Sequence, residues 1–272
     1  MIRSSGWKDI TIGPGIEGVV PDRACCVVPG GGAHRNEPGW LNFVAMHFSD
    51  LPERVAEIRG RAEAAAARGG HSQAVRLVAV TKTHGPEAAI EAWQAGVVDC
   101  GENRVQEALV KMQAVTEPVM WHLIGHLQRN KVHELEHFAL LHSLDSSRLA
   151  DAVCEYGVKR GRAMDALVQV NTSGETAKGG FSPEALRSES DRLTNMPGIR
   201  VIGVMTMAPL EASEVVLRQT FAGARHARQV LAQAGHPATE LSMGMSNDYE
   251  VAVEEGSTMI RIGSILFGAR DS

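Results

Sequence analysis

The sequence contains few cysteines, and their spacing suits neither cross-linking nor metal binding. Among 272 residues there are four, the adjacent Cys25 and Cys26 and the isolated Cys100 and Cys154. Adjacent cysteines are awkward to pair and no zinc-ligand spacing occurs, so we expect neither a disulfide framework nor a bound metal. The pattern fits a reducing compartment, and we therefore expect a cytoplasmic protein.

Long hydrophobic runs and excess positive charge are missing as well. No stretch is long enough to span a membrane, and the first residues lack the apolar run of a secretory signal. The net charge is −5 at pH 7, whereas a general nucleic-acid binder normally carries a basic face. We therefore expect neither membrane nor nucleic acid as a partner, and any anionic ligand needs a local site.

Residues 1–45 differ from the rest of the chain. Glycine and proline punctuate them and no period is sustained, which predicts an irregular N-terminal extension. The run Gly30 to Gly32 is followed by no Lys-Ser/Thr pair, which favours a flexible turn over a phosphate loop. The folded domain is expected over residues 46–272.

Strand-like and helical patterns alternate through that domain. Leu51, Val55, Ile58 and Ala62 recur at helical spacing and predict a helix ahead of the repeats. Eight β-branched runs follow, at 76–82, 98–103, 121–125, 140–144, 166–171, 201–207, 240–243 and 259–267. Repeated strand and helix units imply a parallel sheet, and about eight of them fit a closed (β/α)8 TIM barrel.

The first of these strands ends in a lysine, in "LVAVTKTH", residues 77–84. Strand alternation places Val78, Val80 and Lys82 on one face, so Lys82 enters the barrel mouth if that face is the interior. Function in such barrels lies at the carboxyl ends of strands. Lys82 is either a rim lysine that extends to water or an amine that attacks an aldehyde to form a Schiff base.

The last two repeats have the features of an anion site. "SMGMSNDYEVAVEEG" predicts a strand end and a capped short helix, so Ser246 and nearby N–H groups are candidate phosphate contacts. Gly263 and Ser264 lie in the final predicted strand, where amides can approach a phosphate closely, and Arg261 shares a face with Gly263. Taken alone, the Ser246 segment also fits an ordinary capped helix, Gly263 a glycine-interrupted strand, and Arg261 a buried ion pair. Together with Lys82 they favour pyridoxal 5′-phosphate (PLP) as the ligand.

Several stretches resemble the pyridoxal phosphate homeostasis proteins, which are similar to the barrel domain of alanine racemase. They include "LVAVTKTH", "GENRVQEAL", "WHLIGHLQRNK", "VQVNTSGETAKGGF" and "MIRIGSILFG". The resemblance implies Lys82 as the Schiff-base lysine, Asn103 near the cofactor ring, Arg261 at the pyridine nitrogen, and Ser246, Gly263 and Ser264 at the phosphate. It further implies a PLP carrier that takes part in intracellular PLP homeostasis. We expect apo forms of PLP enzymes as recipients, and a monomer.

Catalytic turnover is not expected, although weak racemase activity stays open. A racemase needs two acid–base groups, and alanine racemase takes its second from a tyrosine near a separate β domain. Here the chain stops at Ser272, and its only tyrosines, Tyr156 and Tyr249, are expected to be structural, with Tyr249 kept open. Arg261 disfavours protonation of the ring nitrogen and would weaken the electron sink. A PLP-dependent amino-acid racemase is the alternative function.

Three other motifs have less support as functional sites. "HELEH", residues 133–137, matches the zinc pattern of metalloproteases, but its extended continuation fails and a solvated helix face is favoured. His122 and His126 share the same spacing across a strand end, which gives little support for a metal. Lys178, in the loop after the fifth strand, is a second candidate amine, although an exposed loop lysine is favoured.

Overall fold

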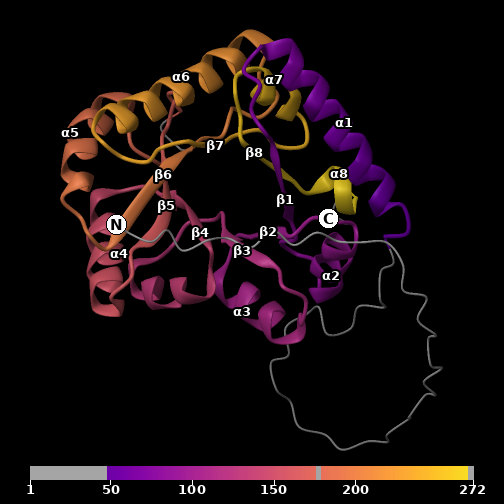
Figure 1. The fold of residues 1–272 in the computed structure, drawn as a ribbon, viewed down its shortest axis with the longest axis horizontal. Helices are drawn as coiled ribbons and strands as arrows, with labels where there is room; N and C mark the ends of the chain where they lie inside the picture. Colours follow the sequence, from indigo (N-terminus) through magenta and orange to yellow (C-terminus); the bar gives the residue numbers. More distant parts are fainter. Residues whose placement is uncertain (1–47, 176–178, 269–272) are drawn as a thin grey trace, which may run out of the picture. The chain divides into compact units, whose positions relative to one another are not determined.

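A computed structural model of the chain describes residues 48–175 and 179–268. Eight parallel strands close into a barrel in which each strand pairs with its sequence neighbours and β8 pairs with β1 (Figure 1). The strands are β1 Arg76–Val80, β2 Asp99–Glu102, β3 Met120–Leu123, β4 Leu140–Leu144, β5 Met164–Gln169, β6 Ile199–Met205, β7 Glu240–Ser242 and β8 Met259–Ile262. The predicted (β/α)8 fold is therefore confirmed.

Helices follow the strands and surround the barrel (Figure 1). They are α1 Leu51–Gly69, α2 Pro86–Gln94, α3 Val105–Ala114, the 3-10 helix η1 Arg129–His137, α4 Ser147–Arg160, α5 Pro183–Thr194, α6 Glu214–Gln233, α7 Tyr249–Glu254 and α8 Ser264–Phe267. The predicted N-terminal helix is α1, which packs against α7 and α8. Arg61 and Arg68 of α1 form ion pairs with Glu250 and Glu254, so the first helix is attached to the last repeat.

Strand alternation separates an outer core from an inner one, as expected from the sequence. Leu77 and Ala79 of β1 belong to the large apolar cluster between strands and helices. Inside the barrel, Leu140, Leu167, Met205 and Met259 form a separate apolar cluster. Four branched or flexible apolar side chains from β4, β5, β6 and β8 thus fill part of the interior and leave the carboxyl end for other residues.

Seven of the eight predicted strands extend past the observed strand end, by one to five residues, and two of these differences bear on the site. β8 ends at Ile262 and not at residue 267, because Leu266 and Phe267 donate their N–H groups to the carbonyl of Gly263 and so continue as helix α8. β1 ends at Val80, two residues before Lys82, because His84 N–H bonds the carbonyl of Thr81 and closes a turn. Gly263 and Ser264 accordingly begin a helix instead of lying in a strand.

The predicted N-terminal extension, residues 1–45, lies outside the described residues, and its boundary stays a prediction. No helix in ranges 48–175 and 179–268 is long and apolar enough to cross a membrane.

Candidate cofactor site

A cavity of about 860 Å³ lies at the carboxyl end of the barrel. Every strand or the loop directly after it contributes to the lining, through Val80, Asn103, Ile124, Asp145, Gln169, Met207, Met245 and Arg261. All six predicted site residues line this one cavity: Lys82, Asn103, Ser246, Arg261, Gly263 and Ser264. Closure of the barrel therefore brings together residues that are up to 182 positions apart in the sequence.

Lys82 lies in the turn that leaves β1. The turn runs from Thr81 to His84, and its third residue, Thr83, has a positive φ of 70°. A β-branched residue rarely adopts this conformation, so the backbone beside Lys82 is strained. Lys82 itself is half-buried. The turn thus holds a lysine at the cavity wall in a conformation that the local sequence alone would disfavour.

Arg261 projects from β8 into the barrel and is 5% exposed. Its Nη1 donates to Ser242 Oγ at 2.5 Å and its Nη2 donates to the carbonyl of Thr206 at 2.9 Å. Within the described ranges no carboxylate forms an ion pair with it, and burial lowers the pKa of its guanidinium to about 10, with Asp248 acting in the opposite direction. A guanidinium has five N–H donors. The remaining ones can meet a ring nitrogen that accepts a hydrogen bond.

Two further segments, around Gly263 and around Ser246, contribute to the cavity lining. A Cβ at Gly263 would lie 3.3 Å from the carbonyl oxygen of Val80 and 3.4 Å from its Cβ, so a side chain would crowd the wall of the cavity. Ser264 starts α8, and the first N–H groups of a helix have no acceptor within it. Ser246 lies before α7, where Asp248 Oδ1 accepts from Met245 N–H at 2.6 Å and fixes the loop. These residues fit a phosphate group.

A buried ion pair supports the segments that carry Lys82 and Asn103, and the sequence patterns did not reveal it. Lys111 of α3 donates to Glu102 Oε1 and to the carbonyl of Thr81, and Thr81 Oγ1 donates to the same carboxylate oxygen. Thr81 precedes Lys82 and Glu102 precedes Asn103. The cluster therefore ties the ends of β1 and β2 together behind the cavity.

The remaining sequence candidates are placed elsewhere. Neither Tyr156 nor Tyr249 is among the cavity-lining residues of the described chain. His133 and His137 lie on the 3-10 helix η1, where residues four apart do not share a face, and both are largely exposed. No cluster of three or more potential metal ligands occurs in the ranges that the structure describes. Lys178 lies outside the described residues.

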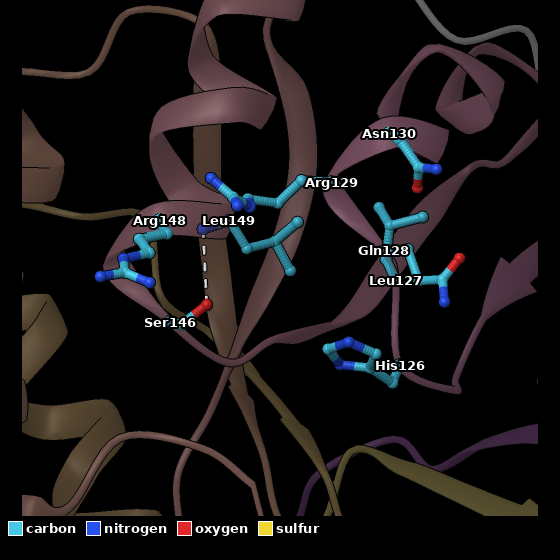
Figure 2. Close-up of a pocket in the computed structure, with 8 residues that line it drawn as sticks. All are labelled: His126, Leu127, Gln128, Arg129, Asn130, Ser146, Arg148 and Leu149. Atoms are coloured by element: carbon cyan, nitrogen blue, oxygen red, sulfur yellow. Dashed lines mark hydrogen bonds between the residues drawn. The ribbon is translucent and has the colours of Figure 1, made fainter.

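A second cavity, of about 480 Å³, lies beside the loop after β3 and the start of α4. Figure 2 shows its lining residues, which include His126, Arg129 and Arg148, and the bond from Leu149 N–H to Ser146 Oγ that caps α4. His126 also lines the larger cavity, where its Nδ1 lies 2.7 Å from Asp145 Oδ2. His126 is thus part of the wall between the two cavities.

The fold and the cavity define a class of protein: residues 55–271 match the family model described as alanine racemase, N-terminal domain. Within this class, the chain belongs to the pyridoxal phosphate homeostasis protein family. A protein of that name from Aquifex aeolicus is 39% identical over 222 residues, which cover 80% of this chain and 97% of the relative. A second, from Pseudomonas aeruginosa, is 38% identical over 227 residues, with 82% and 97% covered.

Solved structures agree with this assignment. PipY of Synechococcus elongatus, in a structure described as having PLP bound, is 37% identical with a TM-score of 0.71, and the match covers 80% of this chain and all of PipY. An alanine racemase from Clostridium difficile has a TM-score of 0.66 at 18% identity, covering 82% of this chain and 58% of the racemase. The second likeness supports the fold alone.

Proposed function

We propose that this protein binds PLP reversibly and takes part in its intracellular homeostasis. The observation that carries the proposal is that one cavity is lined by Lys82, by the buried Arg261 and by the proposed phosphate contacts, which are Ser246, Gly263 and Ser264. Bound PLP supplies an aldehyde that an amine can attack, which allows covalent but reversible attachment. The relatives named above support the same ligand for this chain.

Each site residue has a defined task in this proposal. Lys82 provides the amine that forms the Schiff base, and Asn103 lies beside the cofactor ring. Ser246, Gly263 and Ser264 surround the phosphate with hydroxyl and backbone N–H donors. Arg261 donates a hydrogen bond to the pyridine nitrogen.

The site residues favour a cofactor carrier over an enzyme that turns over substrates. An arginine can donate to the ring nitrogen but has no proton to give up near neutral pH, so the nitrogen stays unprotonated and the ring is a weaker electron sink. No tyrosine lines the described cavity to serve as the second acid–base group of a racemase. We accordingly propose a cytoplasmic monomer that delivers PLP to apo-enzymes and has no catalytic turnover of its own.

Borohydride trapping tests the attachment site. The purified full-length protein is loaded with PLP, its absorption spectrum is recorded, and the Schiff base is reduced and mapped by mass spectrometry of peptides. We expect the reduced adduct on Lys82, its loss in Lys82→Ala, and its retention in Lys159→Ala, which changes an exposed lysine of α4. An adduct on Lys178 with Lys82 unmodified would show that the assignment is wrong.

Chiral analysis separates the carrier from the racemase. The PLP-loaded protein is incubated with single L-amino acids, and the D-enantiomer is measured over time. We expect no formation above the level given by free PLP at the same concentration. Turnover that Lys82→Ala abolishes would favour the racemase instead.

A further inference from the structure

A chain of hydrogen bonds crosses the interior of the barrel and ends on Arg261. Asp99 Oδ1 lies 2.9 Å from His122 Nε2, and His122 Nδ1 lies 2.8 Å from His142 Nε2. His142 Nδ1 in turn lies 2.9 Å from Ser242 Oγ, which accepts from Arg261 Nη1 at 2.5 Å. The five side chains come from β2, β3, β4, β7 and β8.

The chain runs between the two ends of the barrel. Asp99 is the first residue of β2, and its side chain is 12% exposed, whereas Arg261 lines the cavity at the carboxyl end. His142 and Ser242 are fully buried between them. None of Asp99, His122, His142 and Ser242 lines the described cavity, so they reach a ligand there only through Arg261.

The two ends of the chain are a group that can only donate, Arg261, and a carboxylate that accepts, Asp99. Arg261 can only donate, so Ser242 Oγ accepts from it, and the bonds align in one direction when Ser242 gives its own hydrogen to His142 Nδ1. His142 then carries its single proton on Nε2 and donates it to His122 Nδ1. His122 donates from Nε2 to the carboxylate of Asp99. In this arrangement all four bonds point from the arginine to the carboxylate, and each histidine carries a proton on Nε2.

The groups around His142 favour its neutral state. Burial lowers the pKa of His142 well below its ordinary value, and the positive charges of Arg261 and Arg76 act in the same direction. The two arginines come from β8 and β1, and the carboxylate of Asp99 is separated from His142 by the His122 ring. Both ring nitrogens of His142 have a hydrogen-bond partner inside the barrel, His122 on one side and Ser242 on the other.

We propose that Asp99, His122, His142 and Ser242 form a polarised relay that positions Arg261 and supplies its remote counter-charge. Arg261 is buried without an ion pair in the described ranges, and aligned hydrogen bonds polarise one another toward the anion at their end. The relay fixes which N–H groups of Arg261 face the cavity. Its action on the cofactor ring rests on the proposed PLP binding, whereas the relay itself does not.

The first test uses the apo-protein and therefore does not depend on PLP. Long-range ¹H–¹⁵N spectra of the full-length protein report the tautomer and charge of each imidazole, and His122→Gln, His142→Gln and the exposed His226→Gln assign the signals. We expect both rings to carry a proton on Nε2, and His142 to stay neutral between about pH 8 and about pH 6. A proton on Nδ1, or a charged ring at neutral pH, would overturn the relay.

The second test compares variants that separate hydroxyl chemistry from packing. Ser242→Ala removes the only hydroxyl that links His142 to Arg261, and Ser242→Thr keeps it. We expect Ser242→Ala to bind PLP about tenfold more weakly and to shift the midpoint of the pH titration of the bound cofactor's visible absorption. Ser242→Thr should restore both. An unchanged pH titration in Ser242→Ala would exclude the relay from cofactor binding.

Asp99→Asn tests the counter-charge. The amide oxygen can still accept from His122, but the negative charge is lost, so we expect the same pH titration to shift while the fold is retained. Asp165→Asn is the control, because Asp165 pairs with Arg200 outside the relay. If wild-type protein forms no adduct on Lys82, the proposed function is wrong. The ¹H–¹⁵N spectra of the apo-protein then still test the relay. If the adduct forms and Asp99→Asn behaves like Asp165→Asn, the counter-charge role is wrong.

Discussion

Lys111 Nζ lies 2.6 Å from Glu102 Oε1, and the two side chains are 3% and 0% exposed. The pair is placed between α3 and β2, on the outer face of the barrel. Burial raises the pKa of Glu102, and Lys111 opposes that shift. The other carboxylate oxygen, Oε2, is buried without a hydrogen-bond partner among the residues described. Glu102 therefore depends on Lys111 for most of its charge compensation.

Replacing Lys111 by methionine should destabilise the protein strongly. The variant keeps the volume of the side chain but leaves a buried carboxylate uncompensated, so we expect the free energy of unfolding to fall by about 3–5 kcal/mol in urea titrations. Glu102→Gln combined with Lys111→Met should recover part of this loss, because the carboxylate is removed as well. Lys159→Met, on the exposed side of α4, is the control. A loss below about 1 kcal/mol would contradict the prediction.

Gly125 lines the cavity and lies against the backbone of Asn103. A Cβ at this position would overlap the carbonyl oxygen of Asn103 and lie 2.7 Å from its Cα. Because both atoms belong to the backbone, Gly125→Ala has to move the segment that carries Asn103. We expect a loss of about 1–3 kcal/mol in stability and weaker PLP binding, measured by urea and by absorption titration.

The control for this variant is Gly60→Ala. Gly60 lies within α1, and a Cβ there meets no atom within 4 Å. Alanine should stabilise this helix by up to about 1 kcal/mol and leave PLP binding unchanged. Equal effects of the two variants would show that glycine loss as such, and not the contact with Asn103, is responsible.

Much of the barrel and of the site could be predicted because both depend on short-range patterns. Alternation in β8 placed Arg261 and Gly263 on one face, and the end of β1 pointed to Lys82. Barrel closure then determines that these residues meet, since β8 pairs with β1. The error at residue 267 arose because "GSILFG" is as apolar and β-branched as a strand, while its backbone bonds to Gly263 make it helical.

The polar partnerships could not be predicted in the same way. The spacing of His122 and His126 gives little support for a shared metal ion. In the structure His122 faces the barrel interior, whereas His126 lines the cavity. A polar residue at an inward strand position indicates an interior contact, but the partner depends on the register of strands far apart in the sequence. His142 and Ser242 are 100 residues apart and meet only across the closed barrel.

Cys100 should be resistant to alkylation in the folded protein. It is fully buried, and burial, followed by the carboxylates of Glu102 and Asp99, raises the pKa of its thiol to about 12. The thiolate is the reactive form, so almost none is present at pH 8. We expect mass spectrometry after iodoacetamide treatment to find the half-buried Cys154 labelled before Cys100. Labelling of both in urea is the control, and equal native rates would contradict the prediction.

The stability of the fold should decrease in mild acid because of His142. Its pKa in the folded protein lies well below the value near 6.5 of an unfolded chain, so the unfolded state binds more protons as the pH falls below about 6.5. The stabilisation is present in full above that pH and is lost progressively toward the lower, folded pKa. One proton corresponds to at most about 1.4 kcal/mol of unfolding free energy per pH unit.

Urea titrations between about pH 5 and about pH 7.5 measure this slope in wild-type protein and in His142→Gln. The variant is expected to be less stable at neutral pH because the relay is interrupted, yet its stability should fall less steeply with acid. His226→Gln, which changes an exposed histidine of α6, should keep the wild-type slope. Glu102, whose raised pKa favours proton uptake by the folded state, acts in the opposite sense and is common to all three proteins. Parallel curves for wild-type protein and His142→Gln would mean that His142 takes up its proton equally in the folded and unfolded states, which would contradict its lowered pKa in the folded barrel.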